Sequence, residues 1–369
     1  MSFEVYFFWA TSGLLAVYGL VQLWLAIMMA RPPQRFTPRR DRRISILVAA
    51  RNEEALLPAC LDTLLAQDYP SGQMEILVGD DRSEDATAEI IKAYAARDKR
   101  VKYVYIAEDL PNQRGKQNVL AQLFQLAQGE IILVTDADIE QPKAWAAHMV
   151  GGFHRPEVGM VSAPTIVDGR SLFAKMQAID WLFGVSVIKA LAHLDMPITA
   201  VGNNMAVTRE AYDSTGGYEK IPFSITEDYR LFEVVRQAGW RFQWLHQPQV
   251  LNRTYAIEDL GTYFHQRKRW YLGGREGPWY ALFLFGLQAT VNPFLLAAIF
   301  QWSLPMVLGA IGLKMLADFL VVLAGAGRIG RWKIVLYYPL YPFYFFLSIL
   351  ILTIYFLLPI KVNWKGRKF

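Results

Sequence analysis

The sequence contains little cysteine, little histidine and few charged side chains. Cys60 is the single cysteine among the 369 residues, so an intrachain disulfide is excluded. A lone cysteine suits a reducing compartment, and we expect this one to lie in a helix as a small apolar residue. The five histidines show no ligand spacing, and we therefore do not expect a zinc site. No internal repeat or low-complexity tract is found, which argues against a repeat architecture.

Charged residues make up only 19% of the chain, whereas hydrophobic residues make up 53% and aromatic residues 14%. This composition is too apolar for an ordinary soluble protein. The apolar excess lies in the first thirty residues and after about Gly277, while the part between them reads as a water-soluble domain. The distribution predicts a membrane protein with one soluble domain.

Much of the net charge of +5 comes from basic residues beside the apolar segments. These residues are Arg31, Arg35, Arg39, Arg40, Arg42 and Arg43 after the first segment, and Lys361, Lys365, Arg367 and Lys368 after the last. Juxtamembrane basic residues set topology and contact anionic head groups, which explains them better than nucleic-acid binding does. We therefore expect no nucleic-acid partner, an integral protein of the bilayer in a bacterial inner (cytoplasmic) membrane, and a soluble domain in the cytoplasm.

Four apolar segments are long enough to cross a bilayer as helices. They are Phe3–Ala30, Trp279–Trp302, Leu304–Gly325 and Ile334–Ile360. The first is expected to be an uncleaved anchor, because a signal peptide would begin with basic residues and the chain begins Met-Ser-Phe-Glu. Two interrupted segments, Leu172–Leu194 and Glu258–Leu272, are expected to be amphipathic helices at the membrane surface.

This topology contains a conflict. Three spans after a cytoplasmic domain would leave the basic tail outside, against the positive-inside rule. Either one candidate lies in the interface, or the long, proline-interrupted last segment does not simply cross.

Short apolar strands and amphipathic helices alternate in the soluble part. Ile44–Ala50 is a β-branched run, typical of a strand that is buried on both faces. The pattern then predicts the helix Glu53–Gln67, the strand Glu75–Val78, the helix Ala86–Ala96, the strand Val101–Ile106, the helix Lys116–Ala127 and the strand Glu130–Thr135. This alternation predicts an α/β fold with a parallel sheet, whose polar loops after the strands bind ligands.

Three acidic clusters are candidate sites. Asp80-Asp81 follows a strand, where it either belongs to a helix-capping turn or accepts hydrogen bonds from a base or ribose. Asp136-Ala137-Asp138 also follows a strand and is a pair that often occurs by chance. Its two carboxylates point to opposite sides, so one can hold a ribose while the other binds Mg²⁺ together with substrate phosphates. Thr226-Glu227-Asp228 is either an exposed acidic loop or the source of a general base.

A basic-aromatic run, Gln266-Arg267-Lys268-Arg269-Trp270, has two interpretations. It is either a membrane-surface anchor with its tryptophan at the head groups, or a functional element. In the second case a guanidinium neutralises a leaving diphosphate, and the indole offers a flat apolar face to an acceptor.

Taken together, the four motifs resemble those of the membrane subgroup of glycosyltransferase family 2, in the family order. That family carries an aspartate pair, a DxD, a (T/E)(E/D)D and a QxxRW motif on a GT-A fold. Supporting marks are Arg51-Asn52-Glu53-Glu54, Gly115-Lys116-Gln117-Asn118 and Gly202-Asn203-Asn204-Met205 with Arg209-Glu210. The resemblance covers about Ile44 to Gly274. One departure is Arg82, where the family usually has a small residue.

The resemblance implies a role for each matched residue. Asp228, with Glu227 beside it, would be catalytic, Asp228 as the base. Donor binding would fall to Arg51, Glu53, Asp80 or Asp81, Lys116, Asp136, Gln266, Arg269 and Trp270. Asp138, with Asp136, would hold Mg²⁺ or Mn²⁺, and Asn203 and Trp270 would contact the acceptor.

The implied activity is inverting, metal-dependent transfer of a hexose from a nucleotide-sugar, expected to be a UDP-sugar, to a membrane lipid or lipid-linked acceptor. The alternative is a processive polysaccharide synthase, as cellulose and hyaluronan synthases are. The few spans and the lack of an FxVT-type gating loop favour the lipid acceptor. A two-carboxylate glycosidase would need no nucleotide loop, and an inactive scaffold would have lost Asp138 or Asp228, which are both present.

The expected division of the chain is linear. Residues 1–35 form an N-terminal transmembrane anchor and residues 36–257 a cytoplasmic GT-A (Rossmann-like) catalytic domain. Residues 258–277 form an interfacial helix with the QxxRW motif, and residues 278–369 form a C-terminal transmembrane region.

Overall fold

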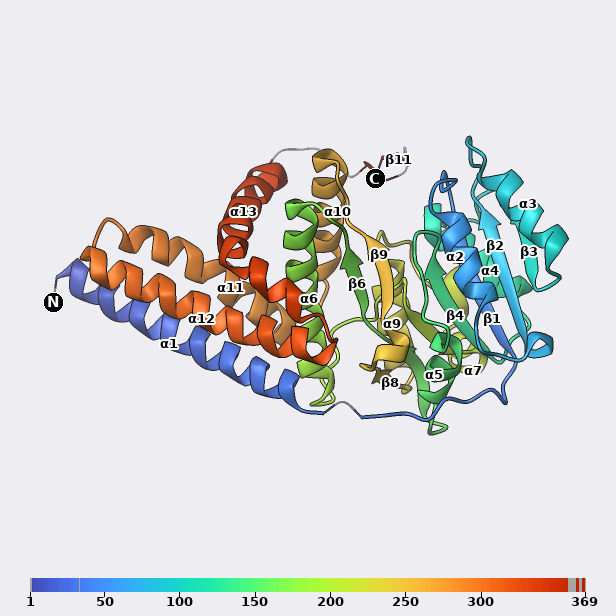
Figure 1. Cartoon of the computed structure of the whole chain (residues 1–369), viewed down its shortest axis with the longest axis horizontal. Coiled ribbons are helices and arrows are strands. Elements are labelled where there is room, and N and C mark those ends of the chain that lie inside the picture. The colour runs from blue at the N-terminus through green and yellow to red at the C-terminus, as the bar shows by residue number, and fades with distance from the viewer. Residues whose placement is uncertain (1, 33, 358–362, 365–366, 369) are drawn as a thin grey trace. The chain divides into compact units, whose positions relative to one another are not determined.

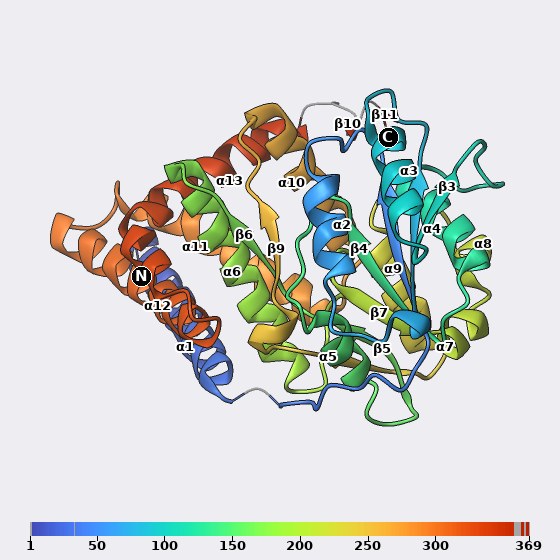
Figure 2. The same cartoon turned by 45° about the vertical axis from the view of Figure 1, so that its right-hand side comes forward.

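The computed structural model describes residues 2–32, 34–357, 363–364 and 367–368. It contains two compact units whose segments alternate along the chain (Figures 1 and 2). A helical unit comprises Met1–Pro32, Arg170–Ile198 and Gly274–Ile360, and a sheet unit comprises Pro33–Gly169, Thr199–Gly273 and Lys361–Phe369. The expected linear boundaries at residues 35, 257 and 277 stay predictions. Lys361, Lys365 and the end of the last expected span lie outside the described residues.

The sheet unit is built on a seven-stranded sheet of order β3-β2-β1-β4-β7-β5-β8. Its strands are β1 Ile44–Ala50, β2 Met74–Asp80, β3 Val101–Tyr105, β4 Ile131–Asp136, β5 Val158–Ser162, β7 Met205–Thr208 and β8 Arg241–Trp244. Strands β1 to β4 are parallel to one another, whereas β7 runs antiparallel to β4 and β5. A separate parallel pair joins β6 (Thr165–Asp168) to β9 (Asn252–Tyr255). The four predicted strands are confirmed, with small shifts at their ends.

Helices cover both faces of this sheet. They are α2 Leu57–Leu65, α3 Thr87–Arg97, α4 Gly115–Leu126, α5 Trp145–Gly151, α7 Arg209–Ser214, α8 Gly217–Lys220 and α9 Glu227–Gln237, with short 3₁₀ turns at Ser71–Gln73 (η1) and Pro248–Val250 (η2). Helix α10, Leu260–Gly274, follows β9 along the chain. Ile46 and Val48 face the core under α2, α3 and α5, while Leu47 between them faces the core under α4 and α9. Burial on both faces explains why β1 is a continuous apolar run.

The predicted helix at Glu53 begins only at Leu57, and this boundary was wrong. The backbone N–H of Glu53 donates to Thr87 Oγ1 at 2.8 Å, and that of Glu54 donates to Asp85 at 3.1 Å. These donors hold the neighbouring loop instead of starting a helix. The helix also ends two residues earlier than predicted, at Leu65, but its place in the chain and the helical, buried position of Cys60 are confirmed.

The helical unit contains α1 Phe3–Ala30, α6 Leu172–Ala192, α11 Trp279–Ala298, α12 Leu304–Arg328, the 3₁₀ helix η3 Trp332–Leu340 and α13 Tyr341–Leu357. Helices α1 and α12 lie along each other in both views (Figures 1 and 2). Among the described residues, four segments are long and apolar enough to cross a membrane: Phe3–Ala30, Trp279–Ala298, Leu304–Arg328 and Trp332–Tyr355. All four fall on predicted spans. The predicted helix around α6 is also present, and its place at a membrane surface stays a prediction.

The last of these segments is broken into η3 and α13. Pro339 and Pro342 flank the break. A proline has no backbone N–H, so it cannot donate the hydrogen bond that would continue the preceding helix. Two tyrosine hydroxyls fix the break within the unit. Tyr338 donates to the carbonyl of Met315 at 2.7 Å, and Tyr341 donates to Asp180 at 3.1 Å. The segment is therefore not one straight helix, as the conflict in the predicted topology had allowed.

A buried polar cluster joins three of these apolar helices. Lys314 and Asp318, one turn apart on α12, form an ion pair of 2.7 Å, and both side chains are almost fully buried. The hydroxyl of Tyr18 on α1 contacts the same aspartate, and it lies 2.5 Å from Gln288 on α11. Ionisable groups among apolar helices are costly unless they are paired. The pair therefore fixes how α1, α11 and α12 pack.

This cluster generates a stability prediction. Asp318→Leu leaves the Lys314 ammonium buried and unpaired, and should lower the free energy of unfolding by about 3–5 kcal/mol. The double variant Lys314→Met/Asp318→Leu removes both charges and should recover most of that loss. Unfolding in detergent micelles measures both. Equal losses in the single and double variants would contradict an ion pair in the helical unit.

Candidate functional site

Three polar loops leave the same edge of the sheet. Strands β1, β2 and β4 are parallel, and the register pairs Ala50 with Asp80 and Ala49 with Asp136. The loops that begin at Arg51, Asp81 and Ala137 are therefore neighbours. This edge, at the carboxyl ends of the strands, is where α/β sheets bind ligands. The first two acidic motifs thus lie together, as the sequence predicted.

The loops after β1 and β2 are held to each other by hydrogen bonds. The N–H of Asn52 donates to Ser83 Oγ at 3.1 Å, and the N–H of Glu84 donates to Asn52 Oδ1 at 2.9 Å. Asn52 has a φ of 52° and Arg82 a φ of 56°. Asparagine tolerates this left-handed conformation, whereas for arginine it is uncommon. Ion pairs with Asp81 at 3.0 Å and Asp109 at 2.6 Å hold the Arg82 side chain in place.

The two aspartates of the first motif do different things. Asp80 is buried, and its carboxylate accepts hydrogen bonds from the Ser83 N–H at 3.0 Å and from the Tyr103 hydroxyl at 3.3 Å. It shapes the loop. Asp81 instead lines a small pocket. The structure thereby separates two residues that the sequence could not tell apart.

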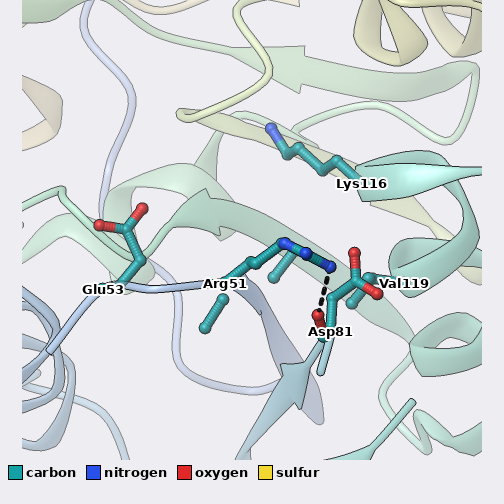
Figure 3. A pocket seen from close by; sticks show the side chains of 7 residues that line it. Arg51, Glu53, Asp81, Lys116 and Val119 are labelled. Carbon is teal, nitrogen blue, oxygen red and sulfur yellow. Dashed lines mark hydrogen bonds between the residues drawn. The ribbon is translucent and has the colours of Figure 1, made fainter. Parts of the chain in front are cut away.

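The pocket is lined by Arg51, Glu53, Asp81 and Lys116, together with the apolar residues Ala49, Ala50 and Val119 (Figure 3). One guanidinium nitrogen of Arg51 donates to the backbone carbonyl of Asp81 at 3.0 Å. Cationic and acidic groups therefore face one small space. Four of the predicted donor-binding residues meet there, and their contact with a donor stays a prediction.

Lys116 connects this pocket to two further motifs. It lies in the first turn of α4, and its Nζ is 2.5 Å from Asp136 Oδ1 and 2.9 Å from Glu227 Oε1. The Lys116 side chain is only 13% exposed. Burial alone would lower its pKa, but the carboxylates of Asp136 and Glu227 outweigh burial and raise it above the ordinary value. Lys116 is therefore a permanent cation between the second and third acidic motifs.

Asp228 follows Glu227 in the first turn of α9. Its Oδ2 accepts the N–H of Gly202 at 2.8 Å, and its Oδ1 accepts the N–H of Tyr229 at 2.8 Å. Burial and the neighbouring Glu227 carboxylate raise the pKa of Asp228 to about 6, against an opposing effect of Lys116. A fixed carboxylate with a pKa close to neutral can accept a proton at physiological pH.

The Gly202-Asn203-Asn204 segment builds the wall beside Asp228. A Cβ on Gly202 would lie 2.7 Å from Asp228 Oδ2, so only glycine permits this approach. The Asn203 side chain accepts from Thr165 at 2.7 Å, and its role toward an acceptor stays a prediction. Asn204 is fully buried and accepts from the Trp145 indole at 2.8 Å. Gly202 was missed as a site residue, although its place in this segment was a signal.

Asp138 is half-buried, with Thr254 Oγ1 3.4 Å from its Oδ2. Within the described part of the chain, no group of three or more His, Cys, Asp or Glu side chains is arranged to hold a metal. One or two carboxylates with substrate phosphates are nevertheless a sufficient ligand set for a hard divalent ion. Asp138 and Asp136 supply oxygen ligands that fit Mg²⁺ or Mn²⁺, and their predicted role as ligands stays a prediction.

Helix α10 carries Gln266, Arg269 and Trp270, which are all half-buried. Its end packs on the third acidic motif, because a Cβ on Gly273 would lie 2.3 Å from the Thr226 side chain. The guanidinium of Arg267 lies 4.6 Å from the centre of the Trp270 ring. The sequence did not assign Arg267 a role, although the predicted helix over Glu258–Leu272 already placed it three residues before Trp270 on one helix face. The predicted roles of Gln266, Arg269 and Trp270 stay predictions.

Comparison with known proteins matches residues 7–369 to glycosyl transferase family 21. The chain is 30% identical over 266 residues to the beta-monoglucosyldiacylglycerol synthase of Trichormus variabilis, covering 72% of this chain and 56% of that protein. It is 28% identical over 235 residues to the poly-beta-1,6-N-acetyl-D-glucosamine synthase of Staphylococcus aureus, covering 63% of this chain and 55% of that protein. The chain thus spans about half the length of these curated relatives.

Among solved structures, the chain is similar to a mannosyltransferase from Pyrobaculum calidifontis in complex with GDP-Man and Mn²⁺. The TM-score is 0.57 at 20% identity, covering 91% of this chain and 96% of that one. This likeness concerns the fold. The predicted α/β fold of the GT-A type is confirmed.

The close approach of Gly202 to Asp228 generates a prediction. Gly202→Ala should displace the carboxylate and lower the free energy of unfolding by about 1–3 kcal/mol, because the packed site cannot absorb a methyl group. Gly72→Ala is the matched control, since a Cβ there meets nothing within 4 Å. Thermal unfolding of both variants measures the difference. Equal stability of the two would show that Gly202 does not abut the carboxylate.

Proposed function

Because the chain belongs to glycosyl transferase family 21, we propose that it transfers a single sugar from a nucleotide-sugar to a membrane lipid or lipid-linked acceptor. The membership also confirms the predicted resemblance to family 2, whose GT-A type it shares. The observation that carries the proposal is the contact of Lys116 with Asp136 and Glu227. It brings the expected donor side and the expected acceptor side of one reaction into a single site.

A lipid acceptor is favoured over a growing polysaccharide. The diacylglycerol-glucosylating relative aligns with 72% of this chain, and the poly-N-acetylglucosamine synthase with 63%. The four candidate spans in the described residues are few for a polymer channel. A processive polysaccharide synthase is the second candidate, because the latter relative makes a polymer according to its name.

The donor is proposed to be a UDP-sugar whose nucleoside lies in the pocket beside Asp81, with Arg51 and Glu53. Departure of the nucleoside diphosphate builds negative charge on its outer phosphate. Mg²⁺ or Mn²⁺, held by Asp138 with Asp136 and the phosphates, would stabilise that charge when bound. Arg269 on α10 is proposed to add a guanidinium, with Gln266 beside it. The mannosyltransferase neighbour was solved with GDP-Man and Mn²⁺, which supports a nucleotide-sugar donor and a divalent metal but not the choice of UDP.

Asp228 is proposed to be the general base, with Glu227 beside it. The N–H groups of Gly202 and Tyr229 orient its carboxylate at 2.8 Å each. With a pKa of about 6, the carboxylate is mostly ionised at neutral pH and can take the proton of an acceptor hydroxyl. The oxygen then attacks the anomeric carbon from the face opposite the leaving diphosphate. One displacement completes the transfer. The indole of Trp270 and the Asn203 region are proposed to contact the acceptor.

The enzyme is proposed to be an integral protein of a bacterial inner membrane with its sheet unit in the cytoplasm, where nucleotide-sugars are made. The arginines after α1 support this orientation. Protease digestion of sealed vesicles of known orientation tests it. Cleavage of the sheet unit only from the cytoplasmic side is expected, and cleavage only from the outside would reverse the assignment.

The direct test of function uses purified full-length protein, several labelled nucleotide-sugars and a host lipid extract. The expected product partitions into organic solvent and carries one or very few sugars, as identified by mass spectrometry. A long water-soluble polymer would favour the synthase instead. Absence of label from every acceptor would reject both functions.

Asp228→Asn should lower turnover about 10²–10⁴-fold, because the amide cannot accept the proton. Donor binding should stay nearly intact, since Asn can still accept the N–H of Gly202. In the wild type, kcat/KM should fall as the pH drops through about 6, where Asp228 becomes protonated. Turnover against pH and equilibrium binding of the donor measure both effects. Normal turnover in the variant would remove Asp228 as the base.

Asp138→Ala should abolish metal-dependent donor binding, because the ion would lose its main protein ligand. Excess chelator on the wild type should have the same effect. Asp213→Ala, at an exposed carboxylate on α7, is the control and should bind donor normally. Full wild-type activity in excess chelator would refute the metal assignment.

A further inference from the structure

Lys116 contacts carboxylates from two distant parts of the chain. Asp136 ends β4 and Glu227 begins α9, so the three residues belong to different elements. The Lys116 Nζ lies 2.5 Å from Asp136 Oδ1 and 2.9 Å from Glu227 Oε1, so one ammonium forms ion pairs with both carboxylates. A lysine that served only a donor phosphate would need no carboxylate on the acceptor side. Its geometry therefore indicates a second task.

The residues around Lys116 hold the same part of the chain. The side chain of Gln117 accepts the N–H of Ser224 at 2.8 Å and donates to the carbonyl of Ile221 at 3.3 Å. Gln113 donates to the carbonyl of Tyr218 at 2.6 Å. The segment 218–224 leads directly into Glu227. The start of α4 thus fixes the approach to α9 by hydrogen bonds, independently of the Lys116 ion pairs.

Burial makes the Lys116 contacts strong enough to matter. Glu227 is 7% exposed and the Lys116 side chain 13% exposed, so solvent screens their attraction poorly. Loss of the ammonium would leave the Glu227 carboxylate buried beside that of Asp228. Two negative charges at such short range repel each other, so the first turn of α9 would have to shift.

From these contacts we propose that Lys116 is a positioning residue, which holds the first turn of α9 against the donor motif and so sets the place of Asp228 relative to the bound sugar. This inference rests on the proposed function and deepens it. Lys116 acts through Glu227, and Glu227 acts by fixing the turn that carries Asp228. A donor-phosphate role for Lys116 alone predicts a different pattern of losses.

A double-mutant cycle separates the two roles. Lys116→Met, Glu227→Gln and the double variant are compared for kcat at saturating donor, and for equilibrium binding of UDP and of GDP with Mn²⁺. Positioning predicts a fall in kcat on the order of 10²-fold in each single variant, because a small displacement of the base is enough. The double variant should lose no more than either single one, since both remove the same contact. Nucleotide binding should change less than about threefold.

Three controls keep the test decisive. Lys116→Arg retains a cation that can reach both carboxylates and should restore most of kcat. Lys102→Met breaks a buried-carboxylate ion pair of 2.6 Å with Glu75 and should leave kcat unchanged. The Tm of every variant identifies any that unfold. If Lys116→Met unfolds, kcat of Lys116→Arg is compared with kcat of Glu227→Gln instead.

The outcomes separate this inference from the proposed function. Losses that multiply in the double variant, or a loss confined to nucleotide binding, would overturn positioning while the transferase activity stands. A wild type that transfers sugar to no lipid and no polymer would overturn the function itself. Fully active Lys116→Met protein would also overturn positioning.

Discussion

The site depends on one ammonium group placed between two carboxylates. Asp136, Glu227 and Asp228 converge on a partly buried edge of the sheet, where uncompensated negative charge is costly. Lys116 makes that convergence possible, at 2.5 Å and 2.9 Å from its partners. Gly202 approaches Asp228 closely because it has no side chain, and hydrogen bonds hold segment 218–224 beside the site. Both contacts place carboxylates close together, which requires the balancing charge of Lys116. The packing of the loops follows from the electrostatics of the site.

The same principle separates the roles of the carboxylates. Asp80 accepts hydrogen bonds that shape its loop, and Asp136 forms an ion pair with Lys116. Asp228 accepts hydrogen bonds from two backbone N–H groups, which orient its carboxylate. Burial and the neighbouring Glu227 carboxylate raise the pKa of Asp228 to about 6. Environments that differ in this way give chemically identical side chains different contacts within one site, and Asp228 is the one proposed as the base.

Much of this organisation could be read from the sequence, for physical reasons. Strands buried on both faces leave continuous apolar runs, so β1 was placed to the residue. Ligands of parallel sheets bind at the carboxyl ends of the strands, so the polar loops after the strands could be predicted to form the binding region. The start of α2, the split between Asp80 and Asp81, and the contact of Lys116 with Glu227 could not be read. Each depends on which tertiary partner captures a polar group, and local spacing does not encode that choice. The break at Pro339 was visible only as a possibility, since the tyrosines that fix it bind distant residues.

The proposed reaction is a single displacement at the anomeric carbon, assisted by one oriented base. The anomeric configuration of the purified product, determined by NMR against that of the donor, tests this most directly. A single displacement gives a new glycosidic linkage with the configuration opposite to the donor linkage, because Asp228 is proposed to activate a hydroxyl on the face away from the leaving diphosphate. A product that retains the donor configuration would contradict it, since retention requires a second displacement or a different nucleophile.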